Sequence, residues 1–180
     1  MPTYKELEIM SFAEAGFLHR APVGPSAYLT GHHIIPDHCF YICKGGRSAQ
    51  GVKNMRVMGV GAYNTLNAPV ILLTSDVGGG KALHHGEVHA NFDPVEKNTA
   101  LTNIAWSYGD VKDLAIRSIL DVFGGTITAD TIEAQLDAYF ITQLGMKNSS
   151  MIRCGEHSSL AGSELAFPTW KSPRAKFKPY

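Results

Sequence analysis

Apolar residues in the first half of the chain are spaced in patterns that predict two strands separated by a long loop. Residues 33–43 are rich in β-branched and aromatic side chains, which predicts a strand that Pro36 interrupts. Residues 69–74 contain the continuous apolar run Val70-Ile71-Leu72-Leu73, which predicts a short buried strand. Residues 47–66 between them are punctuated by glycines and predict a loop.

Helical spacing dominates the remainder of the chain. Residues 4–18 form a helix-compatible stretch ending near Gly16, and residues 81–91 predict a short helix. Residues 109–123 repeat apolar side chains at helical spacing, and Asp130 opens a further helix like a capping box. Because helices and strands do not alternate regularly, the order predicts an α+β fold.

Composition is that of an ordinary globular chain. The 180 residues are 44% hydrophobic and 18% charged, which suits a single domain with its own core. No run of about eighteen apolar residues is present, so we expect no membrane insertion. The first ten residues lack the apolar middle region of a signal peptide, so secretion would need a route without one.

A formal net charge of zero excludes a chain that is basic throughout, as many nucleic-acid binders are. Basic residues do gather near the C-terminus, where Lys171, Arg174, Lys176 and Lys178 could lie along phosphates. Lys81, near the start of the short helix, is another candidate phosphate contact. For all five residues a solvated surface side chain is the open alternative.

The chain has three cysteines, an odd number that does not predict a disulfide framework, so we expect reduced thiols. Cys39, Cys43, Cys154 and His157 offer the donors of a structural zinc site of the three-cysteine, one-histidine type. The absence of a C-x-x-C knuckle weakens that interpretation.

Two pairs among the eight histidines are spaced in a way that favours metal binding. His85 and His89 are four residues apart on the predicted short helix, so both imidazoles share one face. His32 and His33 are adjacent at the predicted start of the first strand, where irregular backbone would let both approach one site. Imidazole suits divalent transition metals, whereas an isolated histidine is more often a hydrogen-bonded packing residue.

Three segments together resemble the GHH group of toxin nucleases within the HNH/Endonuclease VII superfamily. They are Thr30-Gly31-His32-His33-Ile34-Ile35-Pro36, Asn67-Ala68-Pro69-Val70-Ile71-Leu72-Leu73 and His84-His85-Gly86-Glu87-Val88-His89. The resemblance covers roughly residues 28–95 and implies a ββα-metal core. We therefore expect one domain spanning 1–180, with a nuclease core at about 28–95, a helical extension at about 96–150 and a basic tail at 151–180.

The resemblance also implies roles for individual residues. His32, His85 and His89 would be the metal ligands and His33 the general base. Asn67 would hold the loop that orients His33.

Some of these assignments stay open. The long separation between the histidine pair and the second strand leaves Asn64 as an alternative to Asn67. His84 competes with His85 as a ligand. His38 and Asp93 are secondary candidates, the latter as a partner that orients a histidine.

The function implied by the resemblance is a metal-dependent DNA endonuclease that leaves 3′-hydroxyl and 5′-phosphate ends. It would be an antibacterial toxin domain of a polymorphic toxin or type VI secretion effector, delivered by a secretion-system component and acting in the cytoplasm of the target cell. A cognate immunity protein would protect the producer. The divalent ion could be Mg²⁺, Zn²⁺, Mn²⁺ or Ni²⁺.

Alternative functions remain within and outside this class. The chain could be a phage or restriction-type HNH nuclease, or it could cleave RNA. In a different class, it could be a non-catalytic zinc-binding module whose histidines are purely structural.

Overall fold

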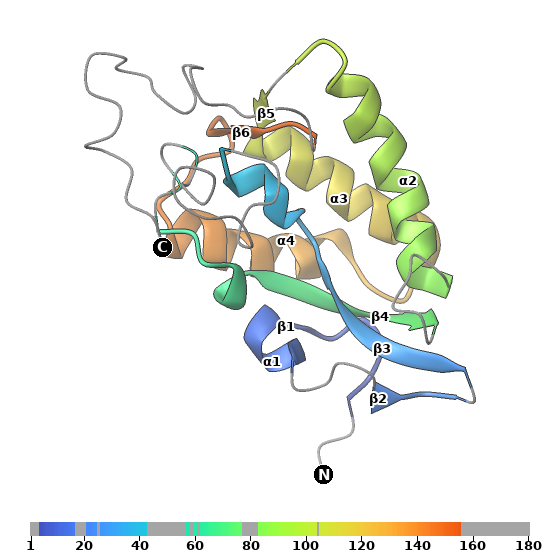
Figure 1. Ribbon diagram of the computed structural model, residues 1–180. Coiled ribbons are helices and arrows are strands. Elements are labelled where there is room, and N and C mark those ends of the chain that lie inside the picture. Colours follow the sequence, from blue (N-terminus) through green and yellow to red (C-terminus); the bar gives the residue numbers. More distant parts are fainter. Residues whose placement is uncertain are drawn as a thin grey trace, which may run out of the picture.

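The computed structural model describes residues 4–16, 21–24, 26–42, 57, 60, 62–76, 83–103 and 105–155 (Figure 1). Its elements in chain order are β1 (Ile9–Ser11), α1 (Phe12–Gly16), β2 (Ala21–Pro22), β3 (Ala27–His33), the 3-10 turns η1 (Asp37–Phe40) and η4 (Thr65–Asn67), β4 (Pro69–Asp76), α2 (Leu83–Thr99), β5 (Ala105–Ser107), α3 (Tyr108–Phe123), α4 (Ala129–Asp137), the π-helical η5 (Ala138–Gln143) and β6 (Met151–Arg153). Helices combined with small antiparallel sheets confirm the predicted α+β class.

The main sheet has four antiparallel strands in the order β1-β4-β3-β2. β3 and β4 pair along the whole length of β3, from Ala27 opposite Asp76 to His33 opposite Val70. A second, two-stranded sheet joins β5 to β6. The long β3–β4 pair is followed in the chain by α2, which packs across it (Figure 1).

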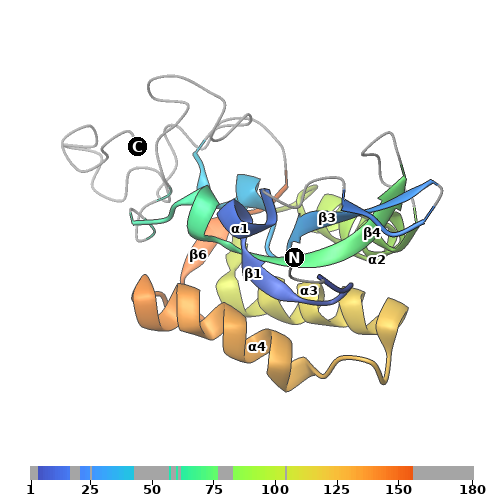
Figure 2. The same ribbon diagram turned by 90° about the horizontal axis from the view of Figure 1, so that it is seen from below.

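β4 is buried on both faces, which explains its uninterrupted apolar run and confirms the strand predicted at residues 69–74. Ile71 and Leu73 belong to the large core beneath the helices. Val70 and Leu72 point the other way, into a smaller cluster with Ala15 of α1. Figure 2 shows α3 and α4 along one face of the sheet and α1 on the opposite face. Alternation along the strand thus serves two separate apolar layers.

Gly31 of β3 lets α1 lie directly against the sheet. A β-carbon built on Gly31 would lie 2.8 Å from Ala15 Cβ and 3.2 Å from Val70 Cγ2. Neither neighbour is the end of a flexible side chain, so any larger residue would push α1 away. The glycine before the histidine pair is therefore a packing requirement.

The strand predicted at residues 33–43 is wrong, because β3 ends at His33 and a 3-10 turn at Asp37–Phe40 follows. The histidine pair consequently closes a strand instead of opening one. Pro36 cannot donate to a ladder, and its carbonyl accepts from Cys39 N at 3.0 Å to start the turn. Apolar side chains such as Phe40 are buried all the same. Their hydrophobicity correctly indicated burial but not extended backbone.

The helix predicted at residues 4–18 is only partly present. Its first part is the edge strand β1, which pairs with β4 and so gains hydrogen bonds that an isolated helical turn would lack. Ser11 then starts α1 as a capping box: its hydroxyl accepts from Glu14 N (3.3 Å), and the Glu14 carboxylate accepts from Ser11 N (2.9 Å). α1 ends at Gly16, as expected.

The helix predicted at residues 81–91 extends further, to Thr99. Val88, Phe92 and Glu96 are buried at successive four-residue steps, so one stripe of the helix stays against the core past the predicted end. The helix predicted at residues 109–123 is confirmed as α3.

The next helix, α4, begins two residues earlier than predicted, because Thr128 rather than Asp130 is its N-cap. The Thr128 hydroxyl accepts from Thr131 N at 3.3 Å. α4 continues as the π-helical η5 to Gln143, and the helical stretch ends before Gly145, whose φ of 71° suits glycine. The short strands β5 and β6 were not predicted; besides their ladder, Trp106 Nε1 donates to the carbonyl of Arg153 at 3.1 Å.

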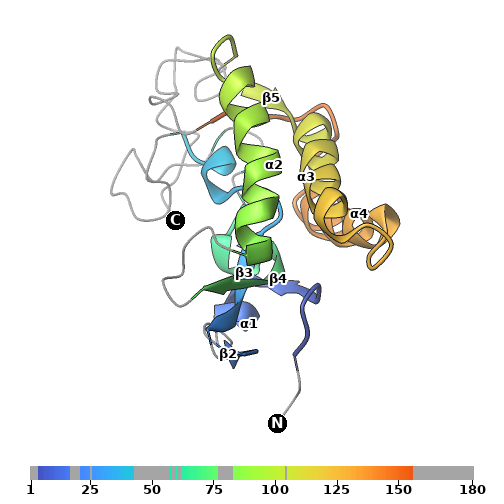
Figure 3. The same cartoon turned by 90° about the vertical axis from the view of Figure 1, so that its right-hand side faces the viewer.

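Residues 96–150, predicted as a helical extension, share one core with the strands and α2. The predicted boundary near residue 96 falls inside α2, and one continuous core contains buried residues from Ile34 to Cys154. Figure 3 shows α2 with α3 beside it and the strands β3 and β4 across the start of α2. The helices α3 and α4 are therefore part of the support for the β3–β4–α2 unit.

Candidate metal centre

Three histidines from two elements converge between the sheet and α2. His32 comes from β3, and His85 and His89 come from the first turns of α2. One ligand nitrogen from each ring lies within 4.8 Å of the other two. The ring centroids are 5.0 Å apart for His32 and His85, 4.8 Å for His32 and His89, and 4.9 Å for His85 and His89.

Local geometry explains this convergence. The i,i+4 spacing sets His85 and His89 on one helical face. His32 pairs with Ile71 of β4, which faces the helical core, so His32 points toward α2 as well. Two independent periodicities, that of the strand and that of the helix, thus bring the three imidazoles together.

His32 is held as a neutral imidazole by its surroundings. Its exposed fraction is 8%, and burial lowers its pKa well below 6.5, with His89, His85 and His33 adding to the effect. A neutral imidazole keeps the lone pair that a cation needs. The site is therefore unfavourable for protons but compatible with a metal ion.

His89 is oriented by a carboxylate on its own helix. His89 Nδ1 donates to Asp93 Oδ1 at 2.9 Å, one turn further along α2. This bond fixes the tautomer that leaves Nε2 as the electron-pair donor. Asp93 thus lies where the sequence suggested an orienting partner.

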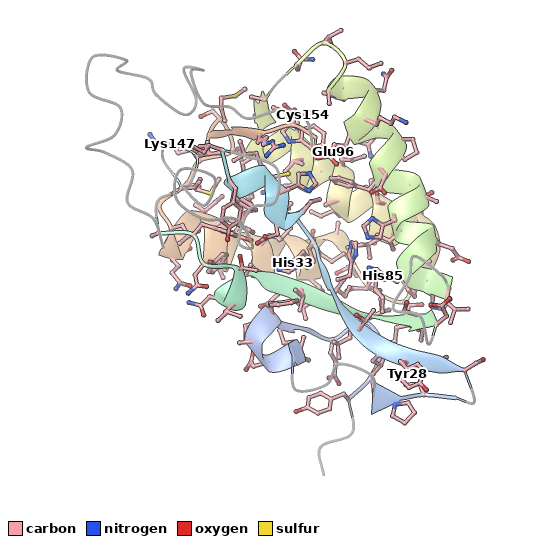
Figure 4. The ribbon with its side chains drawn as sticks, viewed as in Figure 1. Tyr28, His33, His85, Glu96, Lys147 and Cys154 are labelled. Atoms are coloured by element: carbon pink, nitrogen blue, oxygen red, sulfur yellow. The ribbon has the colours of Figure 1, made fainter. Side chains whose placement is uncertain are left out.

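His33 faces the other side of β3 from His32. Its ring stacks on Phe12 of α1, with centroids 4.5 Å apart. It is the last residue of the strand, and it lines the same cavity of about 200 Å³ as the three clustered histidines. In Figure 4, His33 lies at the end of β3 and His85 on α2 across from it. A fourth imidazole therefore borders the cavity from a different direction.

Asp37, which the sequence analysis did not single out, also lines this cavity. Its Oδ1 accepts from Tyr63 Oη (2.7 Å) and from Thr65 Oγ1 (2.6 Å). Burial, followed by the charge of Asp37, raises the pKa of Tyr63 well above its usual value, so the phenol remains a donor. The sequence feature that could have identified Asp37 is its position four residues after His33.

The donor set fits a divalent transition-metal ion. Three neutral imidazoles are suitable ligands for zinc, nickel or related ions. The cavity lined by Gly31, Pro36 and the histidines leaves room beside them for water or a phosphate oxygen. The described residues therefore contain a group able to bind a metal and still present it to another molecule.

Other predicted site residues lie elsewhere. His84 Nδ1 is 2.8 Å from Glu6 Oε1 and 3.0 Å from Thr74 Oγ1, which ties the start of α2 to β4 rather than to the cavity. Asn67 lines a different cavity, beside Ser11 and Tyr139.

Asn64 has a local role of its own. Its side chain accepts from Leu66 N at 2.9 Å and caps η4. Neither Asn64 nor Asn67 is among the residues that line the histidine cavity, although the turn that carries them enters β4 beside the end of β3, where His33 pairs with Val70. The proposed role of an asparagine in the site therefore rests on the sequence motif alone.

His38 belongs to a second group, with Cys39 and Glu96, and not to the histidine cavity. Several predicted residues lie outside the described part of the chain. They are Lys81, Lys171, Arg174, Lys176 and Lys178, together with Cys43 and His157 of the four-residue zinc hypothesis.

No protein-family model, curated protein or solved structure matches this chain. The assignment to the GHH nucleases therefore remains a hypothesis carried by the three sequence motifs. Among the described residues, no helix combines the length and the apolar character needed to cross a bilayer.

Proposed function

We propose that the chain is a metal-dependent endonuclease that hydrolyses DNA phosphodiester bonds. The observation that carries the proposal is the group of His32, His85 and His89 around one cavity with His33 at its border. The order of elements, two antiparallel strands followed by a helix that supplies two histidines, is that expected of a ββα-metal nuclease core. This finer fold assignment is part of the proposal.

Each histidine would have a distinct task in the reaction. His33 would accept the proton of the attacking water, a task suited to an imidazole near neutral pH. Its stacking on Phe12 restricts the rotation of the ring at the border of the cavity. His32, His85 and His89 would hold the ion, which when bound would act as a Lewis acid toward the phosphate and the leaving oxygen.

A purely structural zinc site is the alternative from a different class. Closed structural sites have four protein ligands, whereas three imidazoles converge here. A cavity lies beside these rings. A catalytic site needs such space for its substrate, whereas a structural site does not. The observed arrangement therefore favours catalysis.

Incubation of the purified chain with supercoiled plasmid tests the proposal directly. We expect nicking and linearisation with an added divalent ion, and none with a chelator present. An RNA substrate of similar length in parallel separates DNA from RNA cleavage. A metal-loaded, folded chain that leaves both substrates intact would disprove the nuclease assignment and support the structural alternative.

The biological role is proposed on narrower grounds. A toxin delivered to rival bacteria, a secretion-system component and a cognate immunity protein are supported by the Gly31-His32-His33 resemblance alone. Induced expression in a bacterial cytoplasm should reduce colony formation, and His89→Ala should restore it. Equal survival with both chains would contradict the toxin role.

A further inference from the structure

A second group of metal-binding side chains lies about two turns further along α2. One ligand atom from each of His38, Cys39 and Glu96 lies within 4.8 Å of the others. His38 and Cys39 belong to η1, and Glu96 lies near the end of α2. Figure 4 shows Glu96 at this level of the molecule, well removed from His85. The proposed nuclease reaction uses none of these residues.

Glu96 is an unusual carboxylate because only 6% of its surface is exposed. His38 Nε2 lies 2.7 Å from its Oε1, Gly155 N donates to the same oxygen at 3.1 Å, and Cys39 Sγ donates at 3.8 Å. A buried carboxylate needs such partners. Two of the three partners are themselves side chains that bind metals, which an ordinary structural network does not require.

We propose that His38, Cys39 and Glu96 bind a zinc ion at a site separate from the histidine cavity. Nitrogen, sulfur and oxygen donors together are typical of zinc. Zinc bonds of about 2.0–2.3 Å imply ligand atoms roughly 3.3–3.7 Å apart in a tetrahedron. The 3.8 Å between Cys39 Sγ and Glu96 Oε1 is close to that separation, and the 2.7 Å between His38 and Glu96 would widen by side-chain rotation.

The sulfur ligand would lose its proton on binding. Burial, followed by the charge of Glu96, raises the pKa of the Cys39 thiol well above its usual value, so the cation has to displace that proton. Cys154 lies beside the group, but its Sγ donates to the main-chain oxygen of Glu96 at 3.8 Å and not to the carboxylate. Described residues would therefore fill three of the four positions of a tetrahedral site.

The location suggests what the ion would do. It would tie η1 to α2 next to Asp37, which lines the histidine cavity. η1 directly follows the end of β3, which carries His32 and His33. A metal held here would fix the border of the cavity without taking part in the reaction.

Cobalt substitution tests this site separately from the first one. Co²⁺ bound to a thiolate gives a sulfur-to-metal charge-transfer band in the near ultraviolet, which His32, His85 and His89 cannot produce because they contain no sulfur. We expect the reduced full-length chain to show this band. Cys39→Ser should lose it and should also contain one equivalent of zinc fewer than the parent, as measured by elemental analysis.

Cys154→Ser is the matched control, since it removes a buried thiol from the same region without touching the Glu96 carboxylate. It should retain the band, and circular dichroism should show that both variants are folded. Absence of the band in the parent chain would overturn the site, and this result needs no variant. Persistence in Cys39→Ser, or loss in Cys154→Ser, would overturn the three-residue assignment. None of these readouts depends on nuclease activity.

Discussion

Two adjacent histidines at the end of β3 occupy different surroundings because neighbouring side chains on a strand point to opposite faces. His32 is buried toward α2, where His85 and His89 complete a group of three nitrogens. His33 lies toward α1 and stacks on Phe12, yet still borders the cavity because the strand ends there. A ligand and a base can therefore be consecutive in sequence without competing for the same ion.

This separation predicts different consequences for two alanine variants. His33→Ala should lower the cleavage rate by roughly 10²–10⁴-fold and keep metal binding, because only the proton acceptor is lost. His89→Ala should lose both cleavage and metal binding at the histidine cavity, because it removes a ligand of that site. Plasmid cleavage and calorimetric metal titration measure the two effects. Normal cleavage by His33→Ala would show that another group is the base.

The burial of His32 predicts how the stability of the metal-free chain depends on pH. Because its pKa in the folded state lies well below 6.5, the unfolded chain binds a proton that the folded chain does not. The free energy of unfolding should therefore fall as the pH drops through about 6.5, and this contribution should vanish at higher pH. Thermal denaturation between about pH 8 and pH 5.5 measures the slope, which should be shallower in His32→Gln. An identical slope in that variant would assign the effect to other groups.

At the scale of elements, the contact between α1 and β3 controls the position of His33. Gly31 permits that contact, since a β-carbon there would meet Ala15 Cβ at 2.8 Å. Both Phe12, which stacks on His33, and Ala15 belong to α1. The glycine of the motif thus influences the proposed base through the helix that packs on it.

Gly31→Ala should destabilise the chain by about 1–3 kcal/mol, because the added methyl group overpacks a rigid contact. Cleavage should fall as well, since α1 and Phe12 would shift. The matched control is Gly16→Ala, where an added β-carbon meets nothing within 4 Å. Chemical denaturation of the two variants provides the comparison. Equal stability would show that α1 accommodates the methyl group.

At the scale of the whole molecule, the proposed nuclease unit shares its core with α3 and α4. Buried side chains of β4 and α2 lie in one cluster with Ile119 of α3 and Leu136 of α4. Lys112, only 2% exposed, is bonded by its Nζ to Glu133 (2.6 Å) and Asp137 (3.0 Å), which ties α3 to α4. The site therefore depends on residues far from it in sequence.

A fragment of residues 1–100 should consequently fail to fold, although it contains all four histidines of the cavity. Removing α3 and α4 would expose the apolar face of α2 and of β4 to water. Far-ultraviolet circular dichroism and limited proteolysis, with the full chain as control, test this. A protease-resistant fragment with native-like helix content would show that the shared core is dispensable.

The sequence by itself determined the features that depend on short spacing. The pair His85 and His89 on one helical face, the buried strand β4 and the helix α3 all follow from periodicities within a few residues, and the structure agrees with each. Apolar content alone did not separate strand from turn after His33, because a buried turn needs the same side chains as a buried strand.

Only the tertiary structure decided which distant residues meet. The register of β3 on β4 directs His32 toward α2, and the packing of α2 on η1 brings Glu96 to His38 and Cys39. The tertiary structure also places Asn67 at a different cavity. Strand register and helix packing are fixed by the sum of many contacts between segments remote in sequence, and such sums are not contained in any local pattern. The helical spacing therefore predicted that His85 and His89 share one face, whereas the resemblance alone named His32 as their partner and the strand register brought it to them.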